Sequence, residues 1–186
     1  MKKLFITATM FILILFFFIF LYISSKTIKV DINLLHTNTH SQLSDEQINI
    51  ACYVLTQNFE SQNNNQISKL VSEMYFSQFD RRYKSVTSME SHLIIFATSR
   101  YIKKYIYYKD CYNYLFSNMY FGNGIYGINN ASKYYFNKEY QDLTSDEFIK
   151  LCLLTTNPIL YDLGITNNNY VNIKVEEIRN KLKEKV

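Results

Sequence analysis

Residues 120–128 read Tyr120-Phe121-Gly122-Asn123-Gly124-Ile125-Tyr126-Gly127-Ile128 and contain three of the four glycines in the 186-residue chain. The only proline, Pro158, follows in the same part of the sequence. Glycine loses much backbone entropy on folding and proline lacks an N–H donor, so a chain this poor in both places them where the backbone geometry requires them. We therefore expect residues 120–128 to form a tight helix-to-helix turn with positive φ at two glycines.

The sequence on both sides of this turn has helical periodicity. Ser44 with Gln47, and later Thr144 with Glu147, have the spacing of capping boxes that begin helices. Apolar residues then recur at helical spacing as Ile48, Cys52, Leu55 and Phe59. No sustained alternation of apolar and polar residues is present, so the predicted fold class is mostly α. We expect helices at residues 44–59, 67–76, 92–120 with a break near 107–110, 130–136, 144–154 and 175–185.

The N-terminus carries a long apolar segment. Lys2 and Lys3 precede an uncharged run at residues 4–23. At about 1.5 Å per residue, such a helix spans the ~30 Å hydrocarbon core of a bilayer. The run is too long for a signal peptide, and Ser24-Ser25-Lys26 match a cleavage site poorly. We expect one transmembrane helix in an uncleaved anchor at residues 1–26, a tether at 27–43, and a domain at 44–186 outside the cytoplasm.

Composition narrows the possible partners and cofactors. The net charge of +4 is too small to indicate a nucleic-acid partner. Three widely separated cysteines predict buried free thiols rather than disulfides or a metal site. The three histidines also lack metal-ligand spacing, so no bound metal or cofactor is expected. These residues are Cys52, Cys111, Cys152, His36, His40 and His92.

The glycine spacing also matches a dinucleotide-binding fingerprint. Gly122, Gly124 and Gly127 fit its pattern letter by letter, and Asp146 lies 19 residues beyond Gly127. That fingerprint requires a strand before the glycines and a helix after them. Because the preceding segment has helical periodicity, we exclude a nucleotide-binding domain.

The motifs from residue 120 to Pro158 resemble those of the peptidoglycan glycosyltransferases of family 51. The family pattern is roughly YFGxGxYGIxxAAxxYFxK, followed by L-T-x-x-E and a proline. The resemblance implies a lysozyme-like, mostly helical domain that polymerises lipid II at the outer face of the bacterial cytoplasmic membrane. A single anchor is similar to the monofunctional members. The matching scaffold positions are Tyr120, Phe121, Gly122, Gly124, Tyr126, Gly127, Ala131, Tyr135, Phe136, Glu147 and Pro158.

These scaffold positions are expected to shape the domain rather than to react. We expect Tyr126, Tyr135 and Phe136 to pack in the core. We interpret Glu147 as the capping partner of Thr144 and not as a catalytic acid or base.

The resemblance places a catalytic glutamate in the motif E-D-x-x-F-x-x-H, which corresponds to residues 55–62. Phe59 matches, but Leu55 stands at the glutamate position, and leucine cannot accept a proton. Of the family's G-G-S-T-I-T-Q-Q, aligned with residues 63–70, only Ile67 matches. Ungapped counting places Ile95 at the glutamate of R-K-x-x-E, although a five-residue insertion would bring Glu90 there. Both catalytic glutamates are therefore expected to be replaced.

Other residues could still carry chemistry. Glu60 and Glu90 are the candidate bases, and a divalent cation would enter only if the protein is active. Arg81, Arg82 and Lys84 form a basic loop that could contact a pyrophosphate or lipid headgroups, or could simply be solvated.

Three functional hypotheses follow from these observations. The first is a catalytically degenerate membrane protein of cell-wall synthesis that binds lipid II, nascent glycan or a partner synthase. The second is an active, divergent glycosyltransferase that uses Glu60 or Glu90. The third is a non-functional remnant whose domain is only partly folded.

Overall fold

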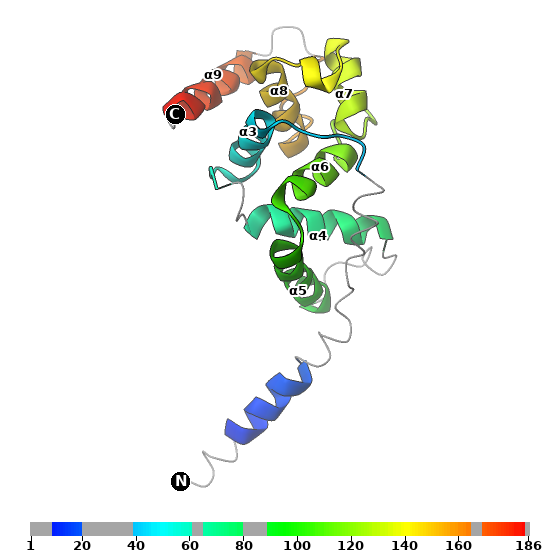
Figure 1. The fold of residues 1–186 in the computed structure, drawn as a ribbon, viewed down its shortest axis with the longest axis vertical. Helices are drawn as coiled ribbons and strands as arrows, with labels where there is room; N and C mark the ends of the chain where they lie inside the picture. The colour runs from blue at the N-terminus through cyan, green and yellow to red at the C-terminus, as the bar shows by residue number, and fades with distance from the viewer. Residues whose placement is uncertain (1–8, 20–38, 61–64, 80–88, 165–168, 185–186) are drawn as a thin grey trace.

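The described part of the chain is helical. The computed structural model describes residues 9–19, 39–60, 65–79, 89–164 and 169–184. Within these residues no strand is formed, only an isolated bridge between Tyr120 and Tyr126. The mostly α prediction is confirmed (Figure 1). The helices of the domain are α3 Asp45–Thr56, α4 Asn65–Phe79, α5 Met89–Tyr105, α6 Tyr108–Asn118, α7 Ile128–Phe136, α8 Ser145–Thr156 and α9 Asn169–Glu184, with a 3-10 turn, η2, at Tyr140–Asp142.

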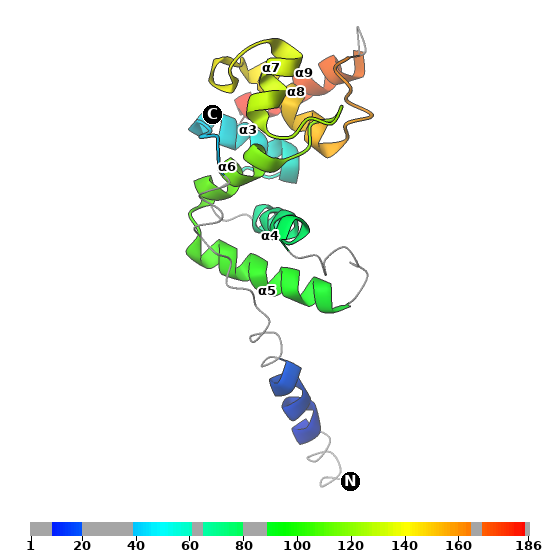
Figure 2. The ribbon, with the colours of Figure 1, turned by 90° about the vertical axis from the view of Figure 1, so that its right-hand side faces the viewer.

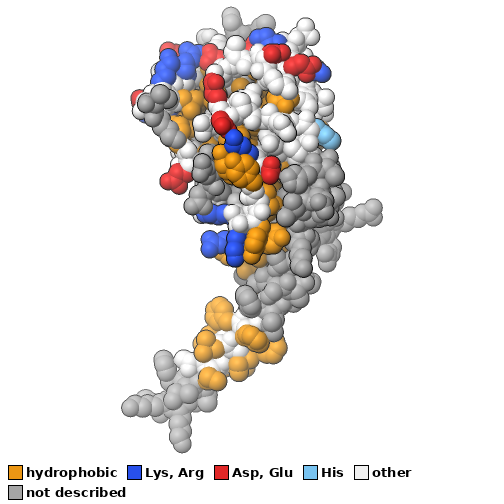
Figure 3. Space-filling view, in the orientation of Figure 1, with side chains coloured by type: hydrophobic (Ala, Val, Ile, Leu, Met, Phe, Trp, Pro, Cys, Tyr) orange, Lys and Arg blue, Asp and Glu red, His pale blue; other side chains and the backbone are white. Residues whose placement is uncertain are grey.

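Residues 9–19 form a separate helix near the N-terminus. Its side chains are almost all apolar and exposed, and they coat this helix in Figure 3. Across the described residues, no helix combines the length and the apolar character that crossing a membrane requires. The rest of the expected anchor, residues 1–8 and 20–26, lies outside the described residues.

Both predicted capping boxes are present. The Ser44 side chain accepts a hydrogen bond from the Gln47 N–H at 3.2 Å, and the Gln47 side chain accepts from the Ser44 N–H at 3.0 Å. Thr144 and Glu147 make the equivalent pair at the start of α8. Each box satisfies backbone donors that a helix N-terminus otherwise leaves free. Helices α3 and α8 begin in this way and pack against each other (Figure 1).

Helix α6 runs through the middle of the domain in both views (Figures 1 and 2). All of its residues from 111 to 116 are buried. Phe116 stacks on Phe148 of α8 at 5.5 Å between ring centroids and contacts Phe121 at 6.2 Å. The predicted break between α5 and α6 is confirmed and falls at residues 106–107. The three cysteines are buried and free, as predicted.

The glycine-rich stretch forms the expected turn between α6 and α7. All three of its glycines have positive φ, one more than predicted, with values of 84° at Gly122, 77° at Gly124 and 79° at Gly127. The Phe121 N–H donates to the Ile125 carbonyl at 2.9 Å, and the Gly127 N–H donates to the Met119 carbonyl at 3.0 Å. These bonds close the loop on itself and connect it to the end of α6. Because a helix precedes the loop, the dinucleotide fingerprint is excluded, as predicted.

One scaffold residue lies on the surface instead of in the core. Tyr126 is 61% exposed, so the prediction that it packs inside is wrong. Its bridge partner is Tyr120, whose ring lies 5.1 Å away, and paired residues of a bridge share one face. Phe121, the neighbour of Tyr120, faces the opposite way and is fully buried. Tyr135 and Phe136 are half-buried against the core, and the Tyr135 hydroxyl donates to the Phe121 carbonyl at 2.9 Å.

Residues 39–43, at the end of the expected tether, are attached to the helical domain. Ser41 and Leu43 are buried. The Ser41 N–H donates to the Ser117 hydroxyl at 3.1 Å, and the Leu43 N–H donates to the Asn113 side-chain oxygen at 2.9 Å. Both acceptors lie on α6, so this short segment fixes the entry of the chain into the domain.

Candidate functional site

The first candidate site is the end of α3, where the resemblance places a catalytic base. The helix ends at Thr56 because Gln57 adopts a left-handed conformation with φ of 55°. Thr56 donates through its hydroxyl to the Cys52 carbonyl at 2.7 Å, and the Cys52 thiol donates to the Asn58 carbonyl at 3.1 Å. The predicted helical stripe therefore stops before Phe59, which lies beyond the helix. These short-range bonds close the helix end with local polar groups.

Leu55 occupies the glutamate position in this last turn. Its side chain is half-buried and packs against the main core, as the apolar stripe predicted. It has no group that can ionise, so this position cannot accept a proton.

Glu60 lies four residues beyond the end of α3, in the segment that follows it. It is exposed, and its N–H donates to the Asn58 side-chain oxygen at 3.0 Å. Within the described residues its carboxylate has no hydrogen bond or ion pair. Glu60 is therefore a solvated carboxylate outside the helix.

The second carboxylate position lies in the α4–α5 pair. Ile95, at that position in α5, is only 4% exposed. Its backbone carbonyl accepts a hydrogen bond from the Ser72 hydroxyl of α4 at 3.3 Å. Glu90 is also in α5, but its side chain lies outside what the structure describes. The position reached by ungapped counting is thus an apolar, buried contact between two helices.

Three other features considered from the sequence are metal binding, the cysteine thiols and the basic loop. They contain no group of three or more histidine, cysteine, aspartate or glutamate side chains that could hold a metal ion. Burial raises the pKa of the Cys111 thiol to about 12 and also raises the pKa of Cys152. Both thiols are therefore protonated at neutral pH and are poor nucleophiles. The basic loop with Arg81, Arg82 and Lys84 lies outside the described residues.

Glu147 has a structural role at the start of α8. Its carboxylate accepts hydrogen bonds from the Lys138 ammonium at 2.7 and 2.9 Å and from the Thr144 N–H at 2.8 Å. Lys138, and then the Thr144 donors, hold the pKa of this carboxyl below its usual range. The prediction that Glu147 is the capping partner of Thr144 is confirmed.

We predict that Glu147→Gln lowers the free energy of unfolding by about 1–3 kcal/mol at pH 7, because the amide loses the charge-assisted bond to Lys138. A carboxyl with a lowered folded pKa stabilises above its unfolded value of about 4.3. The difference between the two proteins should therefore shrink as pH falls below about 4 and wild-type Glu147 becomes protonated. Urea unfolding of both proteins between pH 7 and a pH below about 4 measures this difference in unfolding free energy.

Glu139→Gln is the matched control for this substitution. Glu139 pairs with Lys133 at 3.0 Å, but both side chains are more than half exposed. Such surface pairs contribute about 0–1 kcal/mol. Equal losses in the two variants would contradict the capping role of Glu147.

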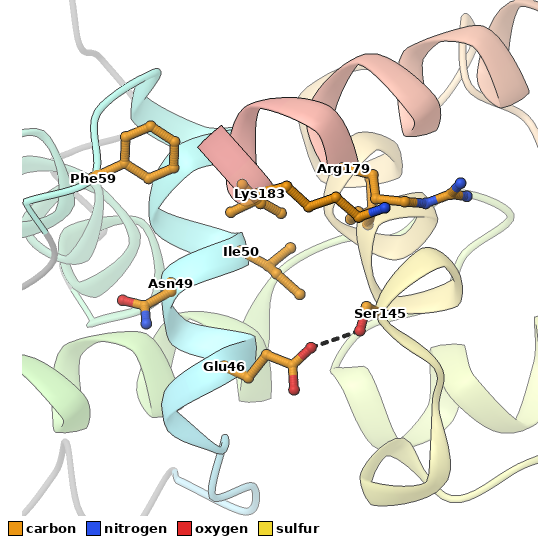
Figure 4. Close-up of a pocket in the computed structure, with 9 residues that line it drawn as sticks. Glu46, Asn49, Ile50, Phe59, Ser145, Arg179 and Lys183 are labelled. Carbon is orange, nitrogen blue, oxygen red and sulfur yellow. Dashed lines mark hydrogen bonds between the residues drawn. The ribbon is translucent and has the colours of Figure 1, made fainter. Parts of the chain in front are cut away.

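A second candidate site is a surface groove between α3, α8 and α9, with a volume of about 640 Å³ (Figure 4). The Glu46 carboxylate accepts a hydrogen bond from the Ser145 hydroxyl at 2.6 Å across it. Leu55 lies nine residues after Glu46, which is about 180° around a helix, so the groove and Leu55 are on opposite sides of α3. The groove is lined by Glu46, Asn49, Ile50, Phe59, Ser145, Ile149, Arg179, Leu182 and Lys183.

This groove was not predicted from the sequence. The only local indication is that Glu46 and Ser145 each lie in the first turn of a helix begun by a capping box. That these two helix starts lie side by side depends on packing between segments 99 residues apart.

Comparison with known protein families matches residues 65–183 to the model of the family described as Transglycosylase, which is more than half of the chain. Penicillin-binding protein 4 of Bacillus subtilis is 24% identical over 151 residues, covering 78% of this chain and 20% of that protein. The biosynthetic peptidoglycan transglycosylase of Haemophilus influenzae is 46% identical over 44 residues, covering 24% of this chain and 18% of that protein.

A shorter match joins the chain to penicillin-binding protein 1F of Bacillus subtilis. It is 49% identical over 45 residues, covering 24% of this chain and 6% of that protein. The chain thus spans a fifth or less of the length of these relatives.

Proposed function

The chain belongs to the transglycosylase family, and from this premise we propose that it is a membrane-anchored protein of peptidoglycan synthesis that binds lipid II or nascent glycan without polymerising it. One observation carries the proposal. The two positions that the resemblance assigns to catalytic glutamates hold Leu55, which packs against the main core, and Ile95, which is buried.

The scaffold around these positions supports binding rather than loss of the fold. The three positive-φ glycines, both capping boxes and the Lys138–Glu147 ion pair are all in place. The core between α3, α6 and α8 is built from closely packed side chains, including the stacked rings of Phe116 and Phe148. These features favour a folded binding protein over a remnant.

The N-terminal segment supports a location at the membrane. Residues 9–19 are helical and expose apolar side chains within the uncharged run at residues 4–23. A fully exposed apolar helix is unfavourable in water, and a bilayer would cover it. We propose that this run anchors the protein in the bacterial cytoplasmic membrane, with the helical domain outside the cytoplasm.

An active enzyme is the second candidate function, and Glu60 is the observation that favours it. Its exposed carboxylate follows the end of α3, close in sequence to the lost base position at Leu55. A turnover that is abolished by Glu60→Gln or Glu90→Gln would support this alternative.

We predict that the full-length protein in lipid nanodiscs binds fluorescently labelled lipid II saturably and releases no glycan polymer. Unlabelled lipid II should displace the probe. Undecaprenyl phosphate, which lacks the sugars and the peptide, should not displace it. Fluorescence anisotropy measures both competitions. Equal displacement by the two competitors would show that only the lipid chain is bound, and would contradict the proposal.

A further inference from the structure

The groove between α3, α8 and α9 has the size of a site for a small ligand. Its volume of about 640 Å³ lies within the ~300–1,000 Å³ of typical ligand pockets. Ile50 and Ile149 form a buried apolar floor, and Phe59 and Leu182 form half-buried walls. An apolar floor of this kind favours methyl and methylene groups.

The rim of the groove carries opposite charges on different helices. Glu46 and Asn49 lie on α3, and Arg179 and Lys183 lie on α9 (Figure 4). Arg179 is paired with Asp146 outside the groove lining. The Lys183 ammonium has no ion pair with any described residue.

Glu46 and Ser145 complete the polar rim. One Glu46 carboxylate oxygen accepts from the Ser145 hydroxyl at 2.6 Å, which fixes the side chain beside the floor. Its other oxygen and the exposed Asn49 amide can bind a ligand. The groove thus offers a cation on α9 and a held carboxylate with an amide on α3, and a zwitterionic ligand complements both.

Building on the proposed function, we propose that this groove binds the short peptide that peptidoglycan carries on its glycan. A free carboxylate of the peptide pairs with Lys183, and an amino group pairs with Glu46. Its alanine methyl groups rest on Ile50 and Ile149. An acyl chain has no polar group to pair with Glu46 or Lys183, and an uncharged sugar has no charge to pair with either, so the charge pattern favours the peptide.

A ligand in the groove would also contact residues 57–60, the segment that follows α3. Phe59 lines the groove, and its ring stacks on Tyr53 at 4.5 Å between centroids. Glu60 is the next residue. A bound peptide therefore contacts the segment that follows the lost base position.

The test uses the full-length protein in nanodiscs with isoleucine methyl groups labelled for NMR. The probe is the soluble peptide N-acetyl-L-Ala-γ-D-Glu-L-Lys-D-Ala-D-Ala, which contains neither sugar nor lipid and whose acetyl group replaces the amide link to the glycan. We expect saturable shifts of the Ile50 and Ile149 methyl resonances, while Ile128, fully buried next to the glycine loop, does not shift. Lys183→Glu should weaken binding at least tenfold.

Lys181→Glu is the matched control, because it makes the same charge change on α9 at a residue that does not line the groove. We expect it to leave the affinity unchanged. The proposal is overturned if Ile50 and Ile149 do not shift, if both lysine variants behave alike, or if a peptide with all charged groups blocked binds as well. The last result would indicate an apolar or helical protein segment as the occupant.

The outcome is separable from that of the proposed function, since the probe lacks the lipid and the sugars. A protein that binds this peptide but not lipid II would contradict the proposed function alone. A protein that binds lipid II but not this peptide would contradict the groove assignment alone.

Discussion

Gly127→Val is expected to prevent cooperative folding of the helical domain, with a loss of more than about 3 kcal/mol of unfolding free energy. Gly127 has φ of 79°, where a β-branched residue is strained by about 1–3 kcal/mol. A Cβ atom at this position would lie 2.7 Å from the Ser117 carbonyl oxygen. This oxygen belongs to the backbone of α6, so it cannot rotate away as a flexible side chain would.

Gly124→Ala separates the two causes of this loss, which are backbone strain at positive φ and the clash with the Ser117 carbonyl oxygen. Gly124 has a similar φ of 77°, but a Cβ atom there meets nothing within 4 Å. The unfolding free energy of Gly124→Ala should fall by about 1–2 kcal/mol because of backbone strain alone. Thermal and urea unfolding of the two variants, with Gly127→Ala as an intermediate, measure the difference. A melting temperature for Gly127→Val equal to that of Gly124→Ala would show that the α6 backbone moves to make room for the added Cβ atom.

The second large effect is expected when glutamates are placed at the two positions that the resemblance assigns to catalytic carboxylates. Ile95→Glu places a carboxyl at a position that is 4% exposed and lies against α4. Burying an unpaired carboxylate costs several kcal/mol or forces it to take up a proton. Leu55→Glu should cost less, because Leu55 is only half-buried at a helix end. We therefore expect the double variant Leu55→Glu/Ile95→Glu to be mostly unfolded.

Ile95→Leu is the control for this pair of substitutions, since a swap of similar volume usually costs less than about 1.5 kcal/mol. Urea unfolding of the four proteins should order their stability as wild type, Ile95→Leu, Leu55→Glu and Ile95→Glu, from most to least stable. A double variant as stable as wild type would show that a polar cleft is preserved beside α5.

Local features of the fold could be predicted from the sequence. Each capping box involves residues three apart, and its hydrogen bonds form within one helical turn. The glycine turn is similarly local, since its bonds join residues 119–127. The position of Tyr126 could not be predicted, because it depends on the bridge with Tyr120, which an apolar pattern does not reveal.

Features that join distant segments could not be predicted. Ser41 reaches Ser117, 76 residues away, and Glu46 reaches Ser145, 99 residues away. Neither pair has a periodicity or a motif that marks it. For the same reason, the apolar character of Leu55 could be predicted from the sequence, but the groove on the opposite side of α3 could not.

Polymerisation of labelled lipid II by the full-length wild-type protein, in nanodiscs, tests the proposed loss of catalysis most directly. The biosynthetic peptidoglycan transglycosylase of Haemophilus influenzae serves as the positive control. We predict no glycan strands from wild type, from Leu55→Glu or from the Leu55→Glu/Ile95→Glu variant, while the control consumes the substrate. Glycan strands from wild type that disappear in Glu60→Gln or Glu90→Gln would contradict the proposal and identify the base that replaced the lost glutamate.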